Sequence, residues 1–515
     1  MDKVQTFADS ATHTLGSSAP LYAKREKIFP RRAEGRFRRL KWIVMAVTLG
    51  IYYLTPWLRW DRGPFAPDQA VLVDLAHRRF YFFFIEIWPQ EFFYVAGLLV
   101  MAGIGLFLVT SVVGRAWCGY ACPQTVWTDL FLWVERAIEG DRNQRMKLDK
   151  APYDANKVAK RVAKHGLWLI IAVATGGAWI FYFADAPTLM RDVLTLNAPF
   201  VAYATIGVLT FTTYSLGGLM REQVCIYMCP WPRIQAAMLD EHSLTVTYND
   251  WRGEPRSRHQ KKAAAKGEPV GDCVDCNACV AVCPTGIDIR NGQQLGCITC
   301  ALCIDACDGV MDKIGRERGL IAYATFNDYN HNMAVATNPA TGQIEPKRVR
   351  DGSGRFVEGL KHFDWRIIVR PRTLIYFAAW CAIGLALLTA LSLRDRLDIN
   401  VQHDRNPVYV TLKDGSIRNG YTVKLLNMVP EPRTIALSIE GLPGATMAIP
   451  DLRLESVTSA DVSVEPDLLR QIKVFVSQPV DDVAAGASDF EFVAKDTGSD
   501  ESDVYDAIFE APDRP

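Results

Sequence analysis

The chain has 515 residues, enough for two or three domains, and it is 49% hydrophobic and 22% charged, a mixture unlike that of any single soluble fold. Its formal net charge of +0 averages over segments that we expect in different compartments. The net charge therefore says nothing about nucleic-acid or membrane-surface partners; we predict no nucleic-acid partner. The first forty residues are polar and carry nine Lys and Arg, so we expect no cleavable signal peptide.

Five segments are apolar enough to cross a bilayer, whose core needs about 20 residues. They lie near 40–58, 92–113, 167–185, 198–218 and 373–391. We predict an α-helical membrane protein with a basic tail over 1–39, a four-span region over 40–235 and a fifth transmembrane helix over 373–391. Glu86 lies in aromatic surroundings just before the second span; a role in handling protons or a metal stays open, but we expect an interfacial glutamate that reaches water.

Basic residues are concentrated in three segments: nine in the N-terminal tail, ten in 115–166 and twenty in 219–372. The segments 59–91 and 186–197 hold four and one. Because short basic loops stay on the cytoplasmic side, we predict a multi-pass protein of a bacterial inner membrane with a cytoplasmic N-terminus. An odd number of spans then places residues 392–515 in the periplasm.

The C-terminal segment 392–515 alternates apolar and polar residues in short runs, such as VYVTL from Val408 and QIKVFV from Gln471. Turn signals separate the runs, among them DG at Asp414 and NG at Asn419. This pattern predicts a small antiparallel β-sandwich that resembles an immunoglobulin-like module. The segment has no cysteine, so it relies on its apolar core alone.

Twelve of the thirteen cysteines form four tight groups, which indicates metal or redox chemistry; Cys381, alone in an apolar run, is expected to pack there. The spacing C-x2-C-x2-C-x3-C occurs twice in the cytoplasmic segment 236–372. In such double runs the fourth cysteine of each run ligates the other cluster. We predict a bacterial-type ferredoxin domain with two 4Fe-4S clusters, one held by Cys273, Cys276, Cys279 and Cys307, the other by Cys297, Cys300, Cys303 and Cys283.

Zinc is the alternative for these cysteines, because CxxC pairs also form tetrahedral zinc sites. Zinc sites usually have two pairs across a longer loop, whereas here three cysteines at intervals of three precede a fourth at four. We therefore favour two clusters. Asp308 stands where the pattern has proline, and we expect it to tune the cluster that Cys307 ligates without removing it.

Two further pairs share a CxxxCP pattern: Cys118 with Cys122, and Cys225 with Cys229. Each follows the cytoplasmic end of a span, so the pairs are expected at similar depth. On an intact helix, residues four apart are too far separated for a disulfide, which favours a soft metal such as copper(I), with Met228 as a further donor. The following prolines disfavour helix at Cys122 and Cys229, so a disulfide stays open, as do a third cluster and a purely structural role.

Together, the five spans, the CxxxCP pairs, the double ferredoxin run and the immunoglobulin-like tail resemble the CcoG family, also called FixG or RdxA. The resemblance covers nearly the whole chain. It implies an accessory protein for assembly of cbb-type cytochrome c oxidase, an oxidoreductase that reduces copper(II) to copper(I). It also implies a role in copper handling for Cys118, Cys122, Cys225 and Cys229, which we take as the catalytic candidates.

The implied partners are copper ions, the lipid bilayer, oxidase assembly factors or a copper transporter, and an unknown cytoplasmic electron donor; a homodimer is left open. Two other functions compete. The first is a quinol-linked electron conduit to a periplasmic reductase, similar to NapH-like membrane ferredoxins that share CxxxCP. The second is a non-catalytic scaffold for oxidase assembly. No Walker or G-x-G-x-x-G pattern indicates a nucleotide or flavin.

Overall fold

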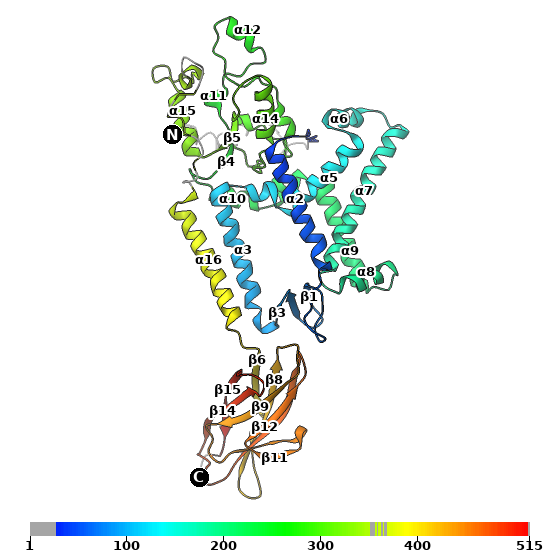
Figure 1. Cartoon of the computed structure of the whole chain (residues 1–515), viewed down its shortest axis with the longest axis vertical. Helices are drawn as coiled ribbons and strands as arrows, with labels where there is room; N and C mark the ends of the chain where they lie inside the picture. The colour runs from blue at the N-terminus through cyan, green and yellow to red at the C-terminus, as the bar shows by residue number, and fades with distance from the viewer. Residues whose placement is uncertain (1–26, 351–355, 358, 362–363, 365–367, 513–515) are drawn as a thin grey trace, which may run out of the picture. The chain divides into compact units, whose positions relative to one another are not determined.

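The computed structural model describes residues 27–512, apart from 351–355, 358, 362–363 and 365–367. The chain forms two compact units. One contains the N-terminal stretch up to Val47 with Val109–Ala172 and Phe211–Arg370, and the other contains Thr48–Leu108, Val173–Thr210 and the C-terminal part from Pro371. Figure 1 shows the elements with their labels.

Four helical stretches among the described residues are long and apolar enough to cross a membrane: Pro89–Val113, Ala155–Ile180, Phe200–Met220 and Pro371–Ser392. They contain the helices α3 (Phe93–Val113), α7 (Ala155–Ile180), α9 (Phe200–Thr212) and α16 (Pro371–Ser392), and α9 continues as the π-helix η3 (Thr213–Met220). Four of the five expected spans are thus present as apolar helices. Cys381, which we expected to pack, is exposed on α16.

The first expected span corresponds to helix α2 (Arg36–Leu54) and the 3-10 turn η1 (Thr55–Trp57). Four basic residues occupy its first six positions, so its apolar stretch is shorter than about 20 residues. Its large apolar side chains Ile43, Val47 and Ile51 are exposed. Whether α2 crosses the membrane therefore stays a prediction.

A three-stranded antiparallel sheet precedes α3, formed by β1 (Val71–Asp74), β2 (Arg79–Phe82) and β3 (Ile85–Ile87). Glu86 lies on β3, and its side chain is 12% exposed in contact with Arg79. Our expectation that this glutamate reaches water is wrong, because the hairpin turns it inward. A 3-10 turn, η2 (Pro89–Glu91), then leads into α3.

Short helices connect the apolar stretches: α4 (Ala116–Tyr120), α5 (Pro123–Glu139), α6 (Arg142–Lys150) and α8 (Ala186–Leu194). Helix α5 is amphipathic and buries acidic residues on its inner face. Glu135 there pairs with Arg145, Arg221 and Lys164. Such a buried carboxylate is tolerated because several cations surround it, and the pairs fix α5 against α6, α7 and the turn after η3.

The ferredoxin segment is built on a two-stranded antiparallel sheet, β4 (Thr245–Tyr248) with β5 (Ile321–Ala324). Its cysteine-bearing helices are α13 (Ala278–Val282) and α14 (Leu302–Lys313), which pack together over a core that includes Val246, Ile304 and Ile321. Further elements are η4 (Val224–Met228), α10 (Trp231–Met238), α11 (Asp250–Gly253), α12 (Gln260–Ala265), η5 (Ile289–Asn291), α15 (Phe326–Ala336) and η6 (Pro346–Val349).

The C-terminal part is a two-layer β-sandwich, as predicted. One sheet has the order β11-β10-β13-β8-β6 with β7 beside β8, and the other has the order β12-β9-β14-β15. Alternate residues of both sheets, such as Tyr421, Leu437 and Phe492, form one buried core. The strands are β6 (Leu397–His403), β7 (Tyr409–Thr411), β8 (Ile417–Asn427), β9 (Arg433–Glu440), β10 (Thr446–Ile449), β11 (Leu454–Val457), β12 (Ser459–Val464), β13 (Leu469–Gln478), β14 (Ala487–Asp496) and β15 (Ser502–Glu510), with η8 (Pro450–Leu452) after β10.

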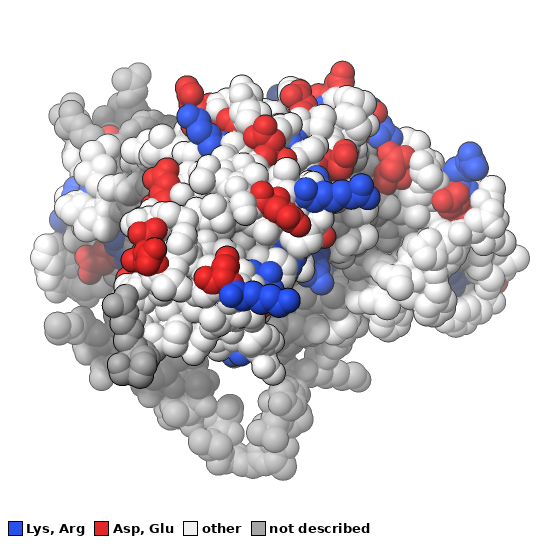
Figure 2. Space-filling view, turned by 90° about the horizontal axis from the view of Figure 1, so that it is seen from below, with Lys and Arg blue, Asp and Glu red and all other residues white. Residues whose placement is uncertain are grey.

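Charged side chains are mixed in sign over the face seen in Figure 2, where acidic and basic groups are interspersed among uncharged ones. Among residues 392–515 there are twelve Lys and Arg against twenty-two Asp and Glu. A surface of this kind favours solubility over attachment to an anionic membrane surface.

Candidate iron–sulfur centre

The eight ferredoxin cysteines surround two separate hollows inside the ferredoxin segment. One, of about 340 Å³, is lined by Cys273, Cys276, Cys279 and Cys307. The other, of about 360 Å³, is lined by Cys283, Cys297, Cys300 and Cys303, with Cys279 at its edge. The chain thus groups the thiols in the same two sets that the spacing predicted, although ligation itself stays a prediction.

The backbone around each hollow has the same unusual conformation. Asp275 and Asn277 flank Cys276 with φ of 49° and 57°, and Thr299 and Ala301 flank Cys300 with φ of 55° and 59°. Non-glycine residues rarely adopt this left-handed region, and successive turns of this kind can gather backbone N–H groups into an anion-binding concavity. Because both loops have this backbone conformation, both are suited to hold the same type of anionic cluster.

Arg290 holds the first loop in place. Its guanidinium donates to Asp275 and Asn277 at 2.6 Å each, and to Asp288 at 2.6 Å. Because Asp275 and Asn277 are the two left-handed residues, these hydrogen bonds stabilise the conformation that opens the hollow. Arg290 is not among the predicted site residues, since nothing in its spacing from the cysteines marks it.

The thiols are poor acids in this environment. Burial raises the pKa of the Cys279 thiol to about 11 and that of the Cys300 thiol to about 12. Positive iron is therefore needed to hold them as thiolates, and loading releases protons. Among the residues that the structure describes, no three of His, Cys, Asp or Glu converge on a single metal ion.

The CxxxCP cysteines lie where the helices break. Cys118 is in α4, and Cys122 has extended ψ of 129° just before Pro123. Cys225 is in the π-helix η4, and Cys229 has extended ψ of 121° before Pro230. The prolines thus open the last turn, as their chemistry predicts. All thirteen cysteines are free thiols in this structure.

The two CxxxCP pairs come together. Burial and, to a smaller extent, the nearby thiols of Cys122, Cys225 and Cys229 together raise the pKa of the Cys118 thiol to about 12. The Cys118 Sγ donates to Gln235 Oε1 at 3.0 Å, and this fully buried amide donates to Thr110 Oγ1 at 3.1 Å. The four thiols form one group without converging on a single ion. Met228, by contrast, is 56% exposed.

The first CxxxCP turn packs directly on the second ferredoxin loop. The Tyr120 hydroxyl donates to the Cys300 carbonyl at 3.2 Å, and Arg115 donates to the carbonyls of Leu295 and Cys297 at 2.6 and 3.1 Å. Gly119 lies so close that an added Cβ would be 2.6 Å from the Ile298 carbonyl oxygen. The chain thus places the dithiols beside one of the two hollows.

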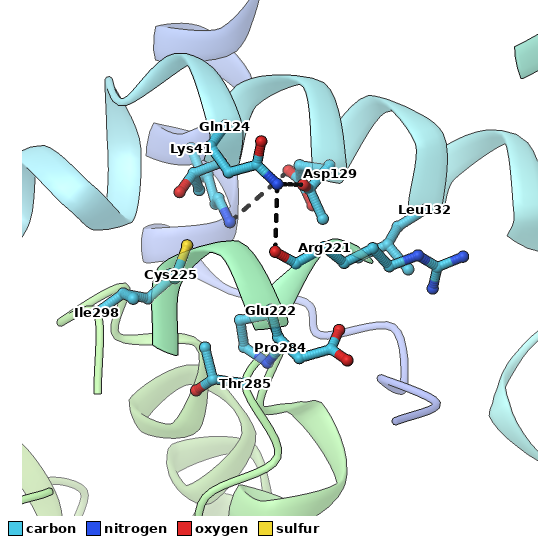
Figure 3. A pocket seen from close by; sticks show the side chains of 12 residues that line it. Lys41, Gln124, Asp129, Leu132, Arg221, Glu222, Cys225, Pro284, Thr285 and Ile298 are labelled. Atoms are coloured by element: carbon cyan, nitrogen blue, oxygen red, sulfur yellow. Dashed lines mark hydrogen bonds and ion pairs between the residues drawn. The ribbon is translucent and has the colours of Figure 1, made fainter. Parts of the chain in front are cut away.

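A third hollow lies between Cys225 and this same loop, lined also by Lys41, Asp129 and Glu222 (Figure 3). Lys41 is 3% exposed, and its Nζ is 4.0 Å from Asp129 Oδ2, which also accepts from Arg38 at 2.8 Å. Burial opposes ionisation of Asp129, but Lys41 and Arg38 outweigh it and lower its pKa. The ammonium group of Lys41 also lowers the pKa of Cys225 and Cys300 against the larger effect of burial.

The fold and these cysteine sets define a class: membrane proteins that carry iron–sulfur clusters for electron transfer. Three family models match the chain. A 4Fe-4S dicluster domain matches residues 220–326, a 4Fe-4S binding domain matches 95–139, and an "IG-like fold at C-terminal of FixG" matches 387–512. The first two models also contain the CxxxCP pairs.

The chain is 69% identical to the nitrogen fixation protein FixG of Rhizobium meliloti (strain 1021) over 96% of this chain and 94% of that protein. It is 57% identical to protein RdxB of Cereibacter sphaeroides over 84% of this chain and 88% of that protein, and 51% identical to protein RdxA of the same organism over 95% and 98%. The chain therefore belongs to the FixG/RdxA family.

Among solved structures, a crystal structure of a FixG-related protein from Vibrio parahaemolyticus is 18% identical over 23% of this chain and 97% of that chain, with a TM-score of 0.20. The family assignment therefore comes from the sequence relatives and the domain models. It makes the protein an iron–sulfur electron-transfer protein with a C-terminal immunoglobulin-like domain.

Proposed function

We propose that this protein is a cupric reductase of the bacterial inner membrane, which passes electrons from its clusters to copper(II) for assembly of a cbb-type cytochrome c oxidase. The observation that supports it most is the packing of the Cys118 turn on the loop that carries Cys297 and Cys300. Thiols that bind soft copper(I) thereby lie next to a site for a one-electron carrier.

In this proposal Cys273, Cys276, Cys279 and Cys307 hold one cluster, and Cys283, Cys297, Cys300 and Cys303 hold the other. When bound, the clusters supply one-electron transfer. Cys118, Cys122, Cys225 and Cys229 bind the copper, and they must approach each other because they do not converge on one ion as they stand. The hydrogen bond from Cys118 to Gln235 keeps the free thiol protonated until the metal displaces the proton.

The test is to mix dithionite-reduced protein with copper(II) and a copper(I) chelator in a stopped-flow instrument. We expect the variants Cys118→Ala/Cys122→Ala and Cys225→Ala/Cys229→Ala to form copper(I) about tenfold more slowly or worse, the loss typical of a damaged metal site. Cys381→Ala is the matched control, because it removes an exposed thiol that lies on α16 and outside the CxxxCP pairs. If both dithiol variants keep the wild-type rate, copper is reduced elsewhere.

Iron content must be measured on the same preparations. Two cubanes predict about eight iron atoms per chain in every one of these variants. About twelve in wild type, falling to eight in either dithiol variant, would instead assign a third cluster to the CxxxCP thiols. In that case the copper site proposed here is wrong, although the protein remains an electron carrier.

A further inference from the structure

A large groove separates α2 and the end of α3 from the ferredoxin segment. It contains about 2010 Å³ of open space, several times more than either cysteine-lined hollow. Leu40 and Val44 of α2 and Val109 and Val113 of α3 line one part of it. Because Val109 and Val113 end an apolar stretch long enough to span a membrane, a molecule dissolved in the bilayer can enter the groove there.

The lining of the groove changes along its length from aliphatic to aromatic and charged side chains. Beyond the aliphatic part, four aromatic rings line it, those of Phe37, Trp117, Tyr120 and Tyr323, and the rings of Phe37 and Tyr323 are 5.5 Å apart. Charged groups, Arg36 and Arg318 among them, line it as well. A flat aromatic head group with polar substituents and a long apolar tail matches this sequence of surfaces.

The aromatic part of the groove touches both cluster sites. The Tyr120 hydroxyl donates to the Cys300 carbonyl at 3.2 Å, and the Tyr323 hydroxyl donates to the Thr299 carbonyl at 2.9 Å. Ile304 and Asp308, which also line the groove, directly follow Cys303 and Cys307 in α14. A redox-active head group held here would lie one residue away from candidate ligands of each cluster.

We propose that this groove binds a quinol of the membrane and that the quinol is the electron donor of the protein. The inference rests on the proposed function only in taking the two cluster sites as acceptors. The quinol loses two electrons and two protons and leaves as the quinone. Each cluster site takes one electron, and the protons pass to water.

The aromatic lining favours a quinol over a phospholipid. The phosphate of a phospholipid would also pair with the guanidinium groups, but its aliphatic chain would lie against the rings of Trp117 and Tyr120 without stacking on them. With a phospholipid in the groove, the proximity of the groove to the cluster loops would also have no function. The chain contains no nucleotide or flavin motif to supply electrons from the aqueous side, so a lipid-soluble carrier fits both the groove and the chemistry.

The test uses the anaerobic, cluster-loaded protein in detergent with a short-chain ubiquinol and a short-chain menaquinol. Leu40→Trp narrows the aliphatic part of the groove, and Ile43→Trp is the matched control, because Ile43 is exposed on the same helix outside the groove. We expect either quinol to bleach the visible iron–sulfur absorbance of wild type and Ile43→Trp, and Leu40→Trp to need about tenfold more quinol or worse. Dithionite must bleach all three equally, which shows intact clusters.

A second readout does not depend on the clusters. An azido-ubiquinone photolabel should modify peptides from 36–44 or 109–121 in wild type and Ile43→Trp, and much less in Leu40→Trp. The proposal is wrong if neither quinol reduces wild-type clusters, if Leu40→Trp behaves as Ile43→Trp, or if the purified protein retains a phospholipid that quinone does not displace. Copper(II) reduction driven by dithionite is measured separately, so its failure would overturn the proposed function and leave this inference standing.

Discussion

The buried position of Glu86 changes the pKa of its carboxyl group. Burial raises its pKa and Asp467 adds to this, so that the pKa is about 7 even though Arg79 opposes both. Arg79 Nη1 lies 3.5 Å from Glu86 Oε1 and 3.4 Å from Asp467 Oδ2. The neighbouring Glu91 differs, since its carboxylate accepts from the Trp88 backbone N–H at 3.0 Å and pairs with Arg394 at 3.2 Å.

We predict that Glu86→Gln changes the pH dependence of stability. The folded chain keeps the Glu86 proton up to about pH 7, whereas an unfolded glutamate loses it near 4.5. Between these values the folded state binds more protons, so wild-type stability falls as pH rises from 4.5 to about 7 and the loss stays above that. Glutamine cannot ionise, so the variant should melt about 2 °C higher or more at pH 8 and match wild type at the acidic end.

The measurement is the thermal midpoint of detergent-solubilised protein from pH 4.5 to 8. Glu91→Gln serves as the contrast, because it weakens a hydrogen-bonded ion pair and should lower the midpoint at pH 8. Parallel pH profiles for wild type and Glu86→Gln would show that Glu86 is ionised in the folded chain.

The sequence predicts how the cysteines are grouped, but it does not predict the residues that support them. Cluster ligation is a local property, since the loop between neighbouring cysteines sets how they wrap a metal centre, and the hollows group the thiols as the spacing predicts. Lys41, Gln235 and Arg290 act across 15 to more than 100 residues of chain. No local pattern marks them, because only the folded chain brings them to the thiols.

Among the elements, prediction succeeded where one periodicity dominates. The four apolar helices and the β-sandwich follow from continuous hydrophobicity and from strict alternation. It did not foresee the small sheet that the aromatic run around Glu86 forms, nor the π-helices η3 and η4. A π-turn depends on one extra residue being accommodated by packing, and hydrophobicity does not report that.

A substitution in α4 tests how closely this helix packs on the cluster loop. In Gly119→Ala the new Cβ would lie 2.6 Å from the Ile298 carbonyl oxygen and 3.0 Å from Cys300 Cα, both of them backbone atoms. Neither can move without shifting the cluster loop, and overpacking of this kind costs about 1–3 kcal/mol. We expect loss of iron or an altered electron paramagnetic resonance spectrum of the reduced protein. Gly103→Ala in α3 is the control, because nothing lies within 4 Å of its added Cβ. An unchanged spectrum and iron content in Gly119→Ala would contradict the close packing of α4 on this loop.

The number of membrane crossings decides in which compartments the N-terminus, the ferredoxin segment and the β-sandwich lie. With α2 as a fifth span, the N-terminus and the ferredoxin segment share the cytoplasm, and the β-sandwich lies in the periplasm. With four spans, the N-terminus and the sandwich lie on the same side. The charges favour five, because six basic residues precede α2, four more occupy its first six positions, and only four lie between it and α3. The contacts agree: Arg38 at the start of α2 pairs with Asp129, whereas Tyr52 near its end donates to the Thr175 carbonyl of α7.

Reporter fusions test this topology directly. Alkaline phosphatase folds only in the oxidising periplasm, where its disulfides form, so we expect it to be inactive when fused after Gly35 or Asp250 and active after Ala511. A green fluorescent reporter at the same three positions should give the opposite pattern and serves as the control for expression. Activity after Gly35 together with activity after Ala511 would mean that α2 does not cross. Activity after Asp250 would place the ferredoxin cysteines in the oxidising compartment, where free thiols in this number do not persist, and both electron-transfer proposals would then lose their reducing environment.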